Sequence, residues 1–269
     1  MAEFDSRFAG SIPALYDRYL GPFIFEPYAA DLAERLADVN EGKLLEVAAG
    51  TGVVTRTLAC TLPENVAIVA TDLNQPMLDF AAGQYSSPRV SWRQANAQSL
   101  PFPDGVFDAV VCQFGAMFFP DKIAAFGEAL RVLKPGGRFI FSSWDRLEES
   151  EIPYAVSQGV IALFPDDPPR FLARIPHGYC DPECIESDVR QAGFPSVKLE
   201  TVQLCSRASS HRDPAIGFCQ GSPLRNEIEA RAASRLAETT EAAAAAVKAR
   251  FGTGPIEGKI QAHIITAYR

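Results

Sequence analysis

The sequence lacks the features that mark several large classes of protein. Its 269 residues include 33 acidic and 25 basic side chains, for a net charge of −8, and the basic residues form no cluster. Because nucleic-acid binding depends on clustered Lys and Arg, we expect no nucleic-acid partner. No run of about 18 apolar residues occurs, so we expect no membrane span. The first ten residues lack the basic and apolar regions of a signal peptide.

Cysteine and histidine are also scarce. The six cysteines follow no disulfide framework, which suits a reducing compartment, and we expect a cytoplasmic protein. Cys180 and Cys184 form a C-x3-C pair with no second pair or histidine set, so we expect no metal site. His177 and His211 are weak candidates for a catalytic base, with solvated loop residues as the alternative interpretation. His263 lies in an expected strand, and we interpret it as structural.

The chain does contain a regular alternation of strand and helix patterns. Short apolar stretches rich in β-branched residues predict strands at residues 43–48, 65–73, 89–95, 105–114 and 138–144. Apolar residues three or four positions apart predict helices at residues 26–39, 52–62, 75–84 and 122–133, with Asn74 as the N-cap of the third. This alternation predicts a parallel sheet with helices on both faces.

The remaining segments differ in composition. Residues 145–180 are rich in proline and aromatic residues, and residues 207–255 have a mostly helical pattern. A helix is expected at residues 181–194, and strands are expected at residues 196–206 and 259–269. The two unusual segments contain four aromatic side chains that favour an uncharged or partly apolar small-molecule substrate. The alternative is that these side chains simply bury the helices of the segments: Phe164, Phe171, Tyr179 and Phe218.

The first expected strand ends in a glycine turn, LEVAAGTG at residues 45–52. In an open α/β sheet, ligands bind beyond the carboxyl ends of the strands, and glycines there allow a close approach of the backbone. Asp72 follows Gly50 by 22 positions, at the end of the second strand, where a carboxylate can accept both hydroxyls of a ribose. Thr55 replaces the third glycine of the dinucleotide pattern G-x-G-x-x-G, which favours a nucleoside without a pyrophosphate. A plain strand-to-helix turn is the alternative.

Four stretches carry a resemblance to a known family: LLEVAAGTGVVTRTLA, ATDLNQPML, RQANAQSLPFPDGVFDAVVCQFGAMFF and ALRVLKPGGRFIFSSW. In this order they resemble the motifs of class I S-adenosylmethionine (SAM)-dependent methyltransferases, in the methyltransferase type 11-like branch related to quinone-biosynthesis C-methyltransferases. The similarity covers residues 40–145, and QAHIITAYR resembles the last strand of that fold. The resemblance implies a Rossmann-like α/β fold, a seven-stranded sheet of order 3-2-1-4-5-7-6 with an antiparallel last strand, and a helical cap insertion.

The resemblance also implies a division of the chain into segments. An N-terminal helical segment at residues 1–40 would cover the cofactor, and residues 41–145 would form the SAM-binding core. Residues 146–180 and 207–255 would be cap insertions that contact the substrate, and a helical cap can pair two chains as a homodimer. Residues 181–206 and 256–269 would complete the sheet.

Roles for individual residues follow from the same resemblance. Residues of the first motif would cradle the methionine part of SAM: Glu46, Ala48, Gly50 and Gly52. Asp72 would hold the ribose, Leu73 and Met77 would pack on the adenine, and Asn96 and Ala97 would bind its edge. Gln113 and Phe114 would face the methionine part and the transferred methyl. Asn96 stands where the family usually has Asp, so its hydrogen bond should be weaker, and an ordinary turn residue is the alternative.

Methyl transfer requires mainly placement, because the methyl carries no proton to remove and a base is needed only if the acceptor must lose one. Tyr16 and Tyr19 are candidates to touch the cofactor, and Tyr16 is also a weak catalytic candidate; aromatic packing of a leading helix is the alternative. QFGA follows the fourth strand instead of an N-P-P-Y-type tetrapeptide, which argues against methylation of nucleic-acid bases. The other functions considered are a non-catalytic protein that binds SAM or S-adenosylhomocysteine (SAH) and an NAD-dependent oxidoreductase.

Overall fold

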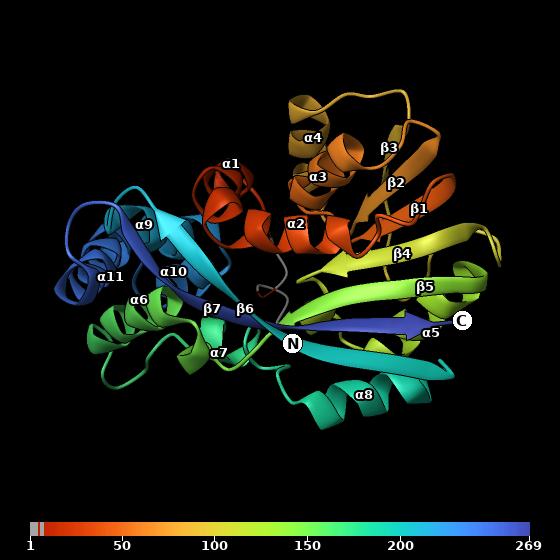
Figure 1. Ribbon diagram of the computed structural model, residues 1–269. Coiled ribbons are helices and arrows are strands. Elements are labelled where there is room, and N and C mark those ends of the chain that lie inside the picture. Colours follow the sequence, from red (N-terminus) through yellow and green to blue (C-terminus); the bar gives the residue numbers. More distant parts are fainter. Residues whose placement is uncertain (1–4, 6–7) are drawn as a thin grey trace.

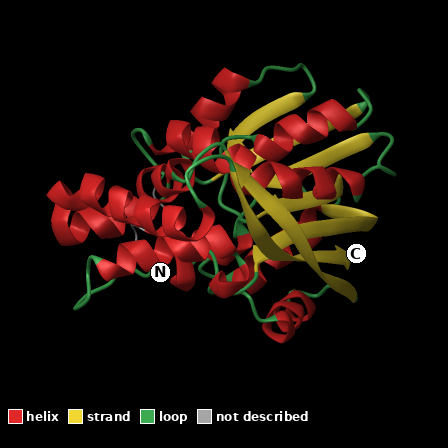
Figure 2. Ribbon diagram, turned by 60° about the vertical axis from the view of Figure 1, so that its left-hand side comes forward, coloured by secondary structure: helices red, strands yellow, loops and turns green. Residues whose placement is uncertain are grey.

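A seven-stranded sheet runs through the centre of the molecule, and helices cover both of its faces (Figures 1 and 2). The computed structural model describes residue 5 and residues 8–269. The sheet has the order β3-β2-β1-β4-β5-β7-β6, which confirms the expected topology. Its strands are β1 (Gly42–Val47), β2 (Val66–Asp72), β3 (Val90–Gln94), β4 (Phe107–Gln113), β5 (Leu133–Trp144), β6 (Ser196–Ala208) and β7 (Ile256–Tyr268).

The pairing of the strands creates a crevice at one edge of the sheet. The first five strands pair in parallel, and β7 runs antiparallel to both β5 and β6. Since β1 pairs with β2 on one side and with β4 on the other, the strand order reverses at β1, and ligands in such sheets bind beyond the carboxyl ends at this point. The central strands are apolar on both faces, and Leu44, Leu45 and Val110 are fully buried.

Figure 1 shows α2, α3 and α4 on one face of the sheet and α5 and α8 on the other. Asp121 and Asp181 cap two of these helices, because each side chain accepts a backbone N–H of the first turn. Asn74 occupies the N-cap position of α4, as expected, but its side chain makes no cap bond: its amide nitrogen instead lies 3.4 Å from the Asp72 carboxylate. The helices are α2 (Glu26–Glu34), α3 (Val53–Thr61), α4 (Gln75–Gln84), α5 (Lys122–Val132) and α8 (Pro182–Gln191).

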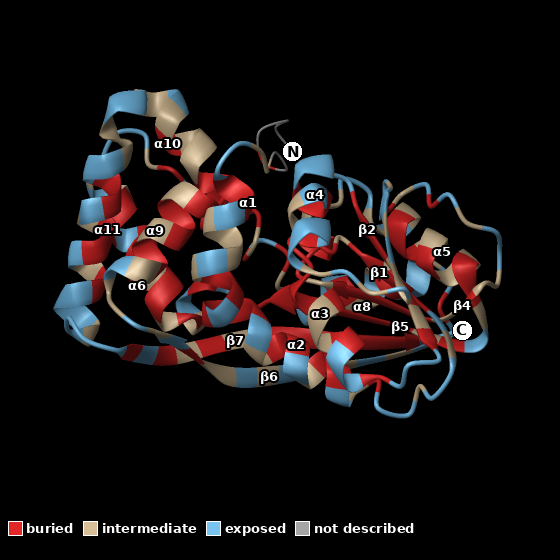
Figure 3. Cartoon of the chain, turned by 90° about the horizontal axis from the view of Figure 1, so that it is seen from above, coloured by how far each residue is buried: buried red, intermediate tan, exposed pale blue. Residues whose placement is uncertain are grey.

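A helical cap lies at one end of the sheet, where β6 and β7 extend beyond the other strands (Figure 1). Gly159 allows α6 and α11 to cross closely, since a Cβ there would lie 2.7 Å from the carbonyl oxygen of Ala242. Figure 3 shows the exposed residues of α11 on its outer side. The cap consists of α6 (Glu151–Ala162), α7 (Phe171–Arg174), α9 (Arg212–Gly221), α10 (Leu224–Ala232) and α11 (Leu236–Phe251), with short 3-10 turns at η4 (Leu147–Glu149) and η5 (Ala233–Arg235).

The N-terminal segment packs against the cap. The short helix α1 (Ile12–Leu15) leads into η2 (Tyr16–Phe25), a π-helix, which is a rare conformation often found at functional sites. Gly217 and Gly221 on α9 allow the approach, because a Cβ at Gly217 would lie 2.7 Å from Cδ2 of Leu20. A Cβ at Gly221 would lie 2.9 Å from the backbone nitrogen of Tyr16. The expected helical segment at residues 1–40 includes residues 1–4, 6 and 7, which lie outside the described residues.

Candidate active site

A hollow lies beyond the carboxyl ends of β1, β2, β3 and β4, where the strand order reverses. We call it the strand-end hollow. Its floor and walls come mainly from the segments that follow these strands, and from the 3-10 turn η3 (Ala116–Phe118). Ten of the residues selected from the sequence line it: Tyr16, Ala48, Gly50, Asp72, Leu73, Met77, Asn96, Ala97, Gln113 and Phe114.

Asp72 is the acidic residue of the strand-end hollow. It ends β2 and is 8% exposed. One carboxylate oxygen accepts the backbone N–H of Gly50 and the other that of Asn74, both at 2.8 Å. Burial raises the pKa of Asp72, and these backbone donors act in the opposite direction. These two backbone donors fix the plane of the carboxylate. The Asn74 side-chain amide also donates to Oδ1, at a longer 3.4 Å, so Oδ2 keeps a lone pair for a ligand hydroxyl, and the second lone pair of Oδ1 holds only a long contact that a second hydroxyl would have to displace.

The backbone at this edge of the sheet is strained at two non-glycine residues. Ala48 has a φ of 57° and Phe114 a φ of 53°, both in the left-handed region. Each directly follows a strand, β1 or β4, and each lines the strand-end hollow. Such conformations cost on the order of 1–3 kcal/mol and cluster at binding and catalytic sites.

Gln113 offers the strand-end hollow an unused acceptor. Its Nε2 donates to the carbonyl oxygen of Phe25 at 3.1 Å, whereas its Oε1 is buried and has no hydrogen-bond partner among the described residues. A buried acceptor without a partner is costly, so this site is suited to a ligand that brings an N–H donor. The amino group of an amino-acid ligand has that chemistry, and the strand-end hollow therefore fits the methionine part of SAM.

Asn96 is a turn residue, as the alternative interpretation of the sequence expects, and it also lines the strand-end hollow. Its Oδ1 accepts the backbone N–H of Gln98 at 3.0 Å, which closes a turn after β3. An amide oxygen has a second lone pair, so this bond leaves it able to accept another donor. Ala97 follows in the same wall.

Three residues assigned to the cofactor from the sequence do not line the strand-end hollow: Tyr19, Glu46 and Gly52. Glu46 is buried and accepts the Thr55 hydroxyl, and burial raises its pKa to about 8. Gly52 has a φ of 79°, and a Cβ there would lie 2.7 Å from the Trp92 ring, so this glycine leaves room for that ring beside the start of α3. Tyr19 lies under the guanidinium group of Arg18.

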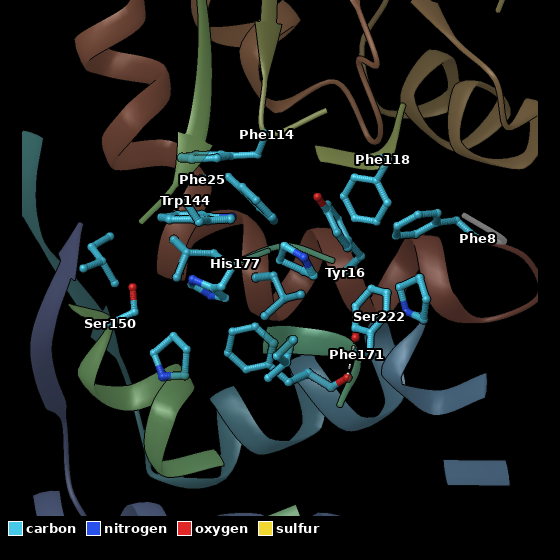
Figure 4. A pocket seen from close by; sticks show the side chains of 18 residues that line it. Phe8, Tyr16, Phe25, Phe114, Phe118, Trp144, Ser150, Phe171, His177 and Ser222 are labelled. Carbon is cyan, nitrogen blue, oxygen red and sulfur yellow. Dashed lines mark hydrogen bonds between the residues drawn. The ribbon is translucent and has the colours of Figure 1, made fainter. Parts of the chain in front are cut away.

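A second hollow, which we call the aromatic hollow, adjoins the first. The strand-end hollow contains about 850 Å³ of empty space and the aromatic hollow about 580 Å³, and both are partly open to solvent. They share Phe8, Tyr16, Phe114 and Phe118 as lining residues (Figure 4). Sequence reasoning missed Phe8 and Phe118; the apolar run MFF after β4 was the available signal for Phe118. Among the four aromatic residues noted in the cap segments, only Phe171 and Phe218 line the aromatic hollow.

His177 lies in the wall of the aromatic hollow and is 7% exposed, so its interpretation as a solvated loop residue is wrong. Its Nδ1 lies 2.6 Å from the carbonyl oxygen of Asp145. A carbonyl only accepts, so Nδ1 carries the proton and Nε2 has a free lone pair. Burial lowers the pKa of His177 to about 4, so the ring is neutral at physiological pH. His211, at the start of α9, lies 3.3 Å from the carbonyl oxygen of Thr253 and lines neither hollow.

Tyr16 stands between the two hollows. Its ring stacks on Phe25 with centroids 4.9 Å apart. Burial, with Asp72 and Asp17 nearby, raises the pKa of the phenol, so it stays protonated and can donate a hydrogen bond.

His263 lies in β7 and not in either hollow. Its Nδ1 lies 3.0 Å from the Thr201 hydroxyl and its Nε2 lies 3.0 Å from the carbonyl oxygen of Cys180, which is consistent with a structural role.

Residue 5 and residues 8–269 contain no group of three or more Cys, His, Asp or Glu side chains suited to a metal ion. Within the same described residues, no helix combines the length and the apolar character needed to cross a membrane.

A sheet of this order, with its last strand antiparallel and an acidic crevice at the reversal of strand order, is the architecture of class I SAM-dependent methyltransferases. Comparison with known proteins agrees. Residues 45–141 match the family described as a methyltransferase domain. The chain is 30% identical over 181 residues to the ubiquinone/menaquinone biosynthesis C-methyltransferase UbiE of Saccharophagus degradans. The aligned residues are 62% of this chain and 73% of that protein. The UbiE of Pseudomonas paraeruginosa is 32% identical over 176 residues, 60% of this chain and 69% of that protein. The chain therefore belongs to the SAM-dependent methyltransferases.

Solved structures support the fold. Phosphoethanolamine N-methyltransferase 2 of Haemonchus contortus, in complex with phosphomonomethylethanolamine and SAH, is 16% identical with a TM-score of 0.62, over 99% of this chain and 60% of that chain. The YcgJ protein of Bacillus subtilis is 18% identical with a TM-score of 0.57, over 90% of this chain and 98% of that chain. At these identities the likeness concerns the fold alone.

Proposed function

We propose that this methyltransferase binds SAM in the strand-end hollow and transfers its methyl group to an uncharged, largely apolar small molecule in the aromatic hollow. The observation that carries the proposal is the pair of adjoining hollows with four residues in common. SAM supplies a methyl group on a positively charged sulfur. The acceptor atom would form a bond to the methyl carbon, in line with the carbon–sulfur bond, and that bond would break with its electron pair going to sulfur, so that SAH is the leaving group. A donor in one hollow and an acceptor in the other would meet between Tyr16 and Phe114.

Particular residues would hold the cofactor. Asp72 would accept the ribose hydroxyls, because two backbone N–H groups already orient its carboxylate. Gln113 would accept the amino group through its unpaired Oε1. Leu73 and Met77 would pack on the adenine, and the turn at Asn96 and Ala97 would bind its edge. Tyr19, Glu46 and Gly52 are not proposed as cofactor contacts, because they lie outside the lining.

The aromatic hollow indicates the character of the acceptor. Its 18 lining residues include no Asp, Glu, Lys or Arg, and its one histidine is neutral. An ionised acceptor would lose hydration there without gaining a partner of opposite charge, so an uncharged molecule is favoured. Stacked rings around the hollow, such as Phe25 with Tyr16, favour an apolar or aromatic body.

The division of labour along the chain is part of the same proposal. Residues 41–145 would bind the cofactor, and residues 1–40 would cover it. Residues 146–180 and 207–255 would form most of the acceptor site. A cytoplasmic location and a homodimer formed through the cap stay predictions.

Isothermal titration tests the cofactor assignment. We expect micromolar binding of SAM and of SAH, and no heat with NAD. Transfer of tritium from methyl-labelled SAM to products separated from SAM by chromatography, with pools of uncharged apolar compounds and pools of charged metabolites as acceptors, tests the acceptor class. Binding of NAD in preference to SAM, or labelling of charged acceptors alone, would refute the proposal.

A further inference from the structure

The aromatic hollow contains a buried hydroxyl whose hydrogen-bonding capacity is unused. Ser150 lines the hollow and is 1% exposed, and its Oγ has no hydrogen-bond partner among the described residues. A hydroxyl removed from water without a partner is unfavourable, and such groups in native proteins usually receive a ligand or an ordered water.

The local structure does not account for this serine. Ser150 directly precedes α6 and so occupies its N-cap position, where serine normally accepts a backbone N–H of the first turn. Its side chain makes no such bond. Ser222, in the same lining, is fully used by the protein: its hydroxyl donates to the carbonyl oxygen of Phe218 at 2.6 Å and accepts the N–H of Leu224 at 3.2 Å.

His177 supplies a second free polar atom in the aromatic hollow. Its Nδ1 is bound to the carbonyl oxygen of Asp145, and no described residue bonds to its Nε2. Figure 4 shows Ser150 and His177 on the side of the hollow away from Phe8 and Phe118, two of the four residues shared with the strand-end hollow. Neither Ser150 nor His177 lines the strand-end hollow itself, so the free hydroxyl and the free imidazole nitrogen belong to the part of the aromatic hollow outside the proposed cofactor site.

We propose that the acceptor carries a hydroxyl group at the end remote from its methylated atom, and that Ser150 Oγ and His177 Nε2 hold this hydroxyl. The proposal rests on the proposed function and narrows its substrate class. A hydroxyl both donates and accepts, so it can donate to the imidazole nitrogen and accept from the serine. An ether or ketone oxygen only accepts and would leave Nε2 unpaired. Ser150 and His177 are then positioning residues, and neither acts as the base.

Binding of simple probes to the full chain saturated with SAH tests this assignment. The probes are 2-naphthol, its apolar isostere 2-methylnaphthalene and its acceptor-only analogue 2-methoxynaphthalene, followed by quenching of tryptophan fluorescence. We expect 2-naphthol to bind about three- to ten-fold more tightly than 2-methoxynaphthalene, the range of one net hydrogen bond, and by at least that factor more tightly than 2-methylnaphthalene, which can form neither bond. In Ser150→Ala and in His177→Phe, the affinity for 2-naphthol should fall toward that for 2-methylnaphthalene.

Ser222→Ala is the matched control, because it removes a hydroxyl of the same lining that the protein itself uses; the ratio between the probes should not change. SAH is titrated first into every variant, and retained affinity shows that the fold and the cofactor site are intact. A parent protein that does not bind SAH would refute the proposed function itself. Equal affinity of the parent for 2-naphthol and its analogues, binding of none of them, or equal weakening of all probes in Ser150→Ala would overturn the hydroxyl assignment.

Discussion

Phe114 and Trp144 stack face to face, with ring centroids 3.7 Å apart and ring planes 1° from parallel. They come from the ends of the neighbouring strands β4 and β5, and the left-handed backbone of Phe114 accompanies this placement. Phe114 lines both hollows, whereas Trp144 lines the aromatic hollow alone. The strained backbone at Phe114 therefore places one ring between the proposed cofactor and acceptor sites.

Asp72→Ala should weaken SAH binding by more than about 1.5 kcal/mol, or over ten-fold, because it removes a charged acceptor for two hydroxyl groups. Isothermal titration measures the change. Asp79→Ala is the control, because Asp79 lies on α4 and accepts only the exposed side chain of Gln75. Titration of Asp72→Ala like the parent would contradict the ribose role.

Substitution of Gly50 should affect cofactor binding, whereas substitution of Gly52 should affect the stability of the fold. Gly50→Val should abolish SAH binding, because Gly50 has a φ of 56° and its Cβ position faces Met77 of the strand-end hollow at 3.6 Å. Gly52→Ala should lower the unfolding free energy by about 1–3 kcal/mol and leave the SAH affinity of the folded protein nearly unchanged, because its Cβ would meet Trp92.

Gly83→Ala is the control for both glycine variants, since nothing lies within 4 Å of its Cβ position. It should change neither property adversely and should stabilise α4 by about 0.5–1 kcal/mol. Chemical denaturation and SAH titration of the three variants separate the two effects. Normal SAH binding by Gly50→Val would show that this turn is only structural.

The proton held by the Glu46 carboxyl should make the unfolding free energy of the protein fall as the pH rises toward 8. Its pKa is about 8 in the folded chain against 4.5 as a free side chain, so the folded state holds a proton that the unfolded state has lost. Between these values the unfolding free energy falls with rising pH. His177, with its pKa lowered from 6.5 to about 4, has the opposite effect between pH 4 and 6.5, and this effect fades over about the next pH unit, so the comparison with a variant that lacks the Glu46 carboxyl separates the two.

Glu46→Gln keeps an acceptor for the Thr55 hydroxyl but cannot ionise. Melting temperatures at pH 6.5, 7.2 and 8 should therefore decline less in this variant than in the parent, both without cofactor. Parallel declines would mean that Glu46 is ionised in the folded protein.

Gly221→Ala should change the shape of the aromatic hollow by displacing Tyr16, although Gly221 itself does not line the hollow. Its Cβ would lie 2.9 Å from the backbone nitrogen of Tyr16, so η2 must shift away from α9. We expect a loss of about 1–3 kcal/mol in unfolding free energy and weaker binding of apolar probes. Gly254→Ala, with open space at its Cβ position, is the control. Unchanged probe binding would show that η2 is not held in place by α9.

The sequence predicted the core better than the acceptor site, for a physical reason. Strands such as β4 are buried on both faces and so appear as continuous apolar runs, and the sheet topology then brings Gly50 and Asp72 together at the strand ends. Motif spacing does not reveal which way a side chain points, so the sequence does not show that Glu46 and Gly52 of the first motif lie outside the lining of the strand-end hollow.

The aromatic hollow had no comparable signal. Its lining extends along the chain from Phe8 to Ile260, so only the packing of the cap against η2 brings these residues together. The π-helical conformation of η2 has no sequence pattern of its own. The burial of His177 was likewise unexpected, because nothing in a proline-rich segment indicates that it folds under Trp144, 6.0 Å away.

The helices α9, α10 and α11 are inserted between β6 and β7, two strands that pair over 13 residues. The two ends of the insertion are thus held next to each other whatever its length, and lengthening a loop with fixed ends adds little entropic cost. This part of the chain could be exchanged for another while the strand-end hollow stays as it is. An engineer who wishes to redirect the enzyme toward a new compound has a natural point of grafting at the tip of this hairpin.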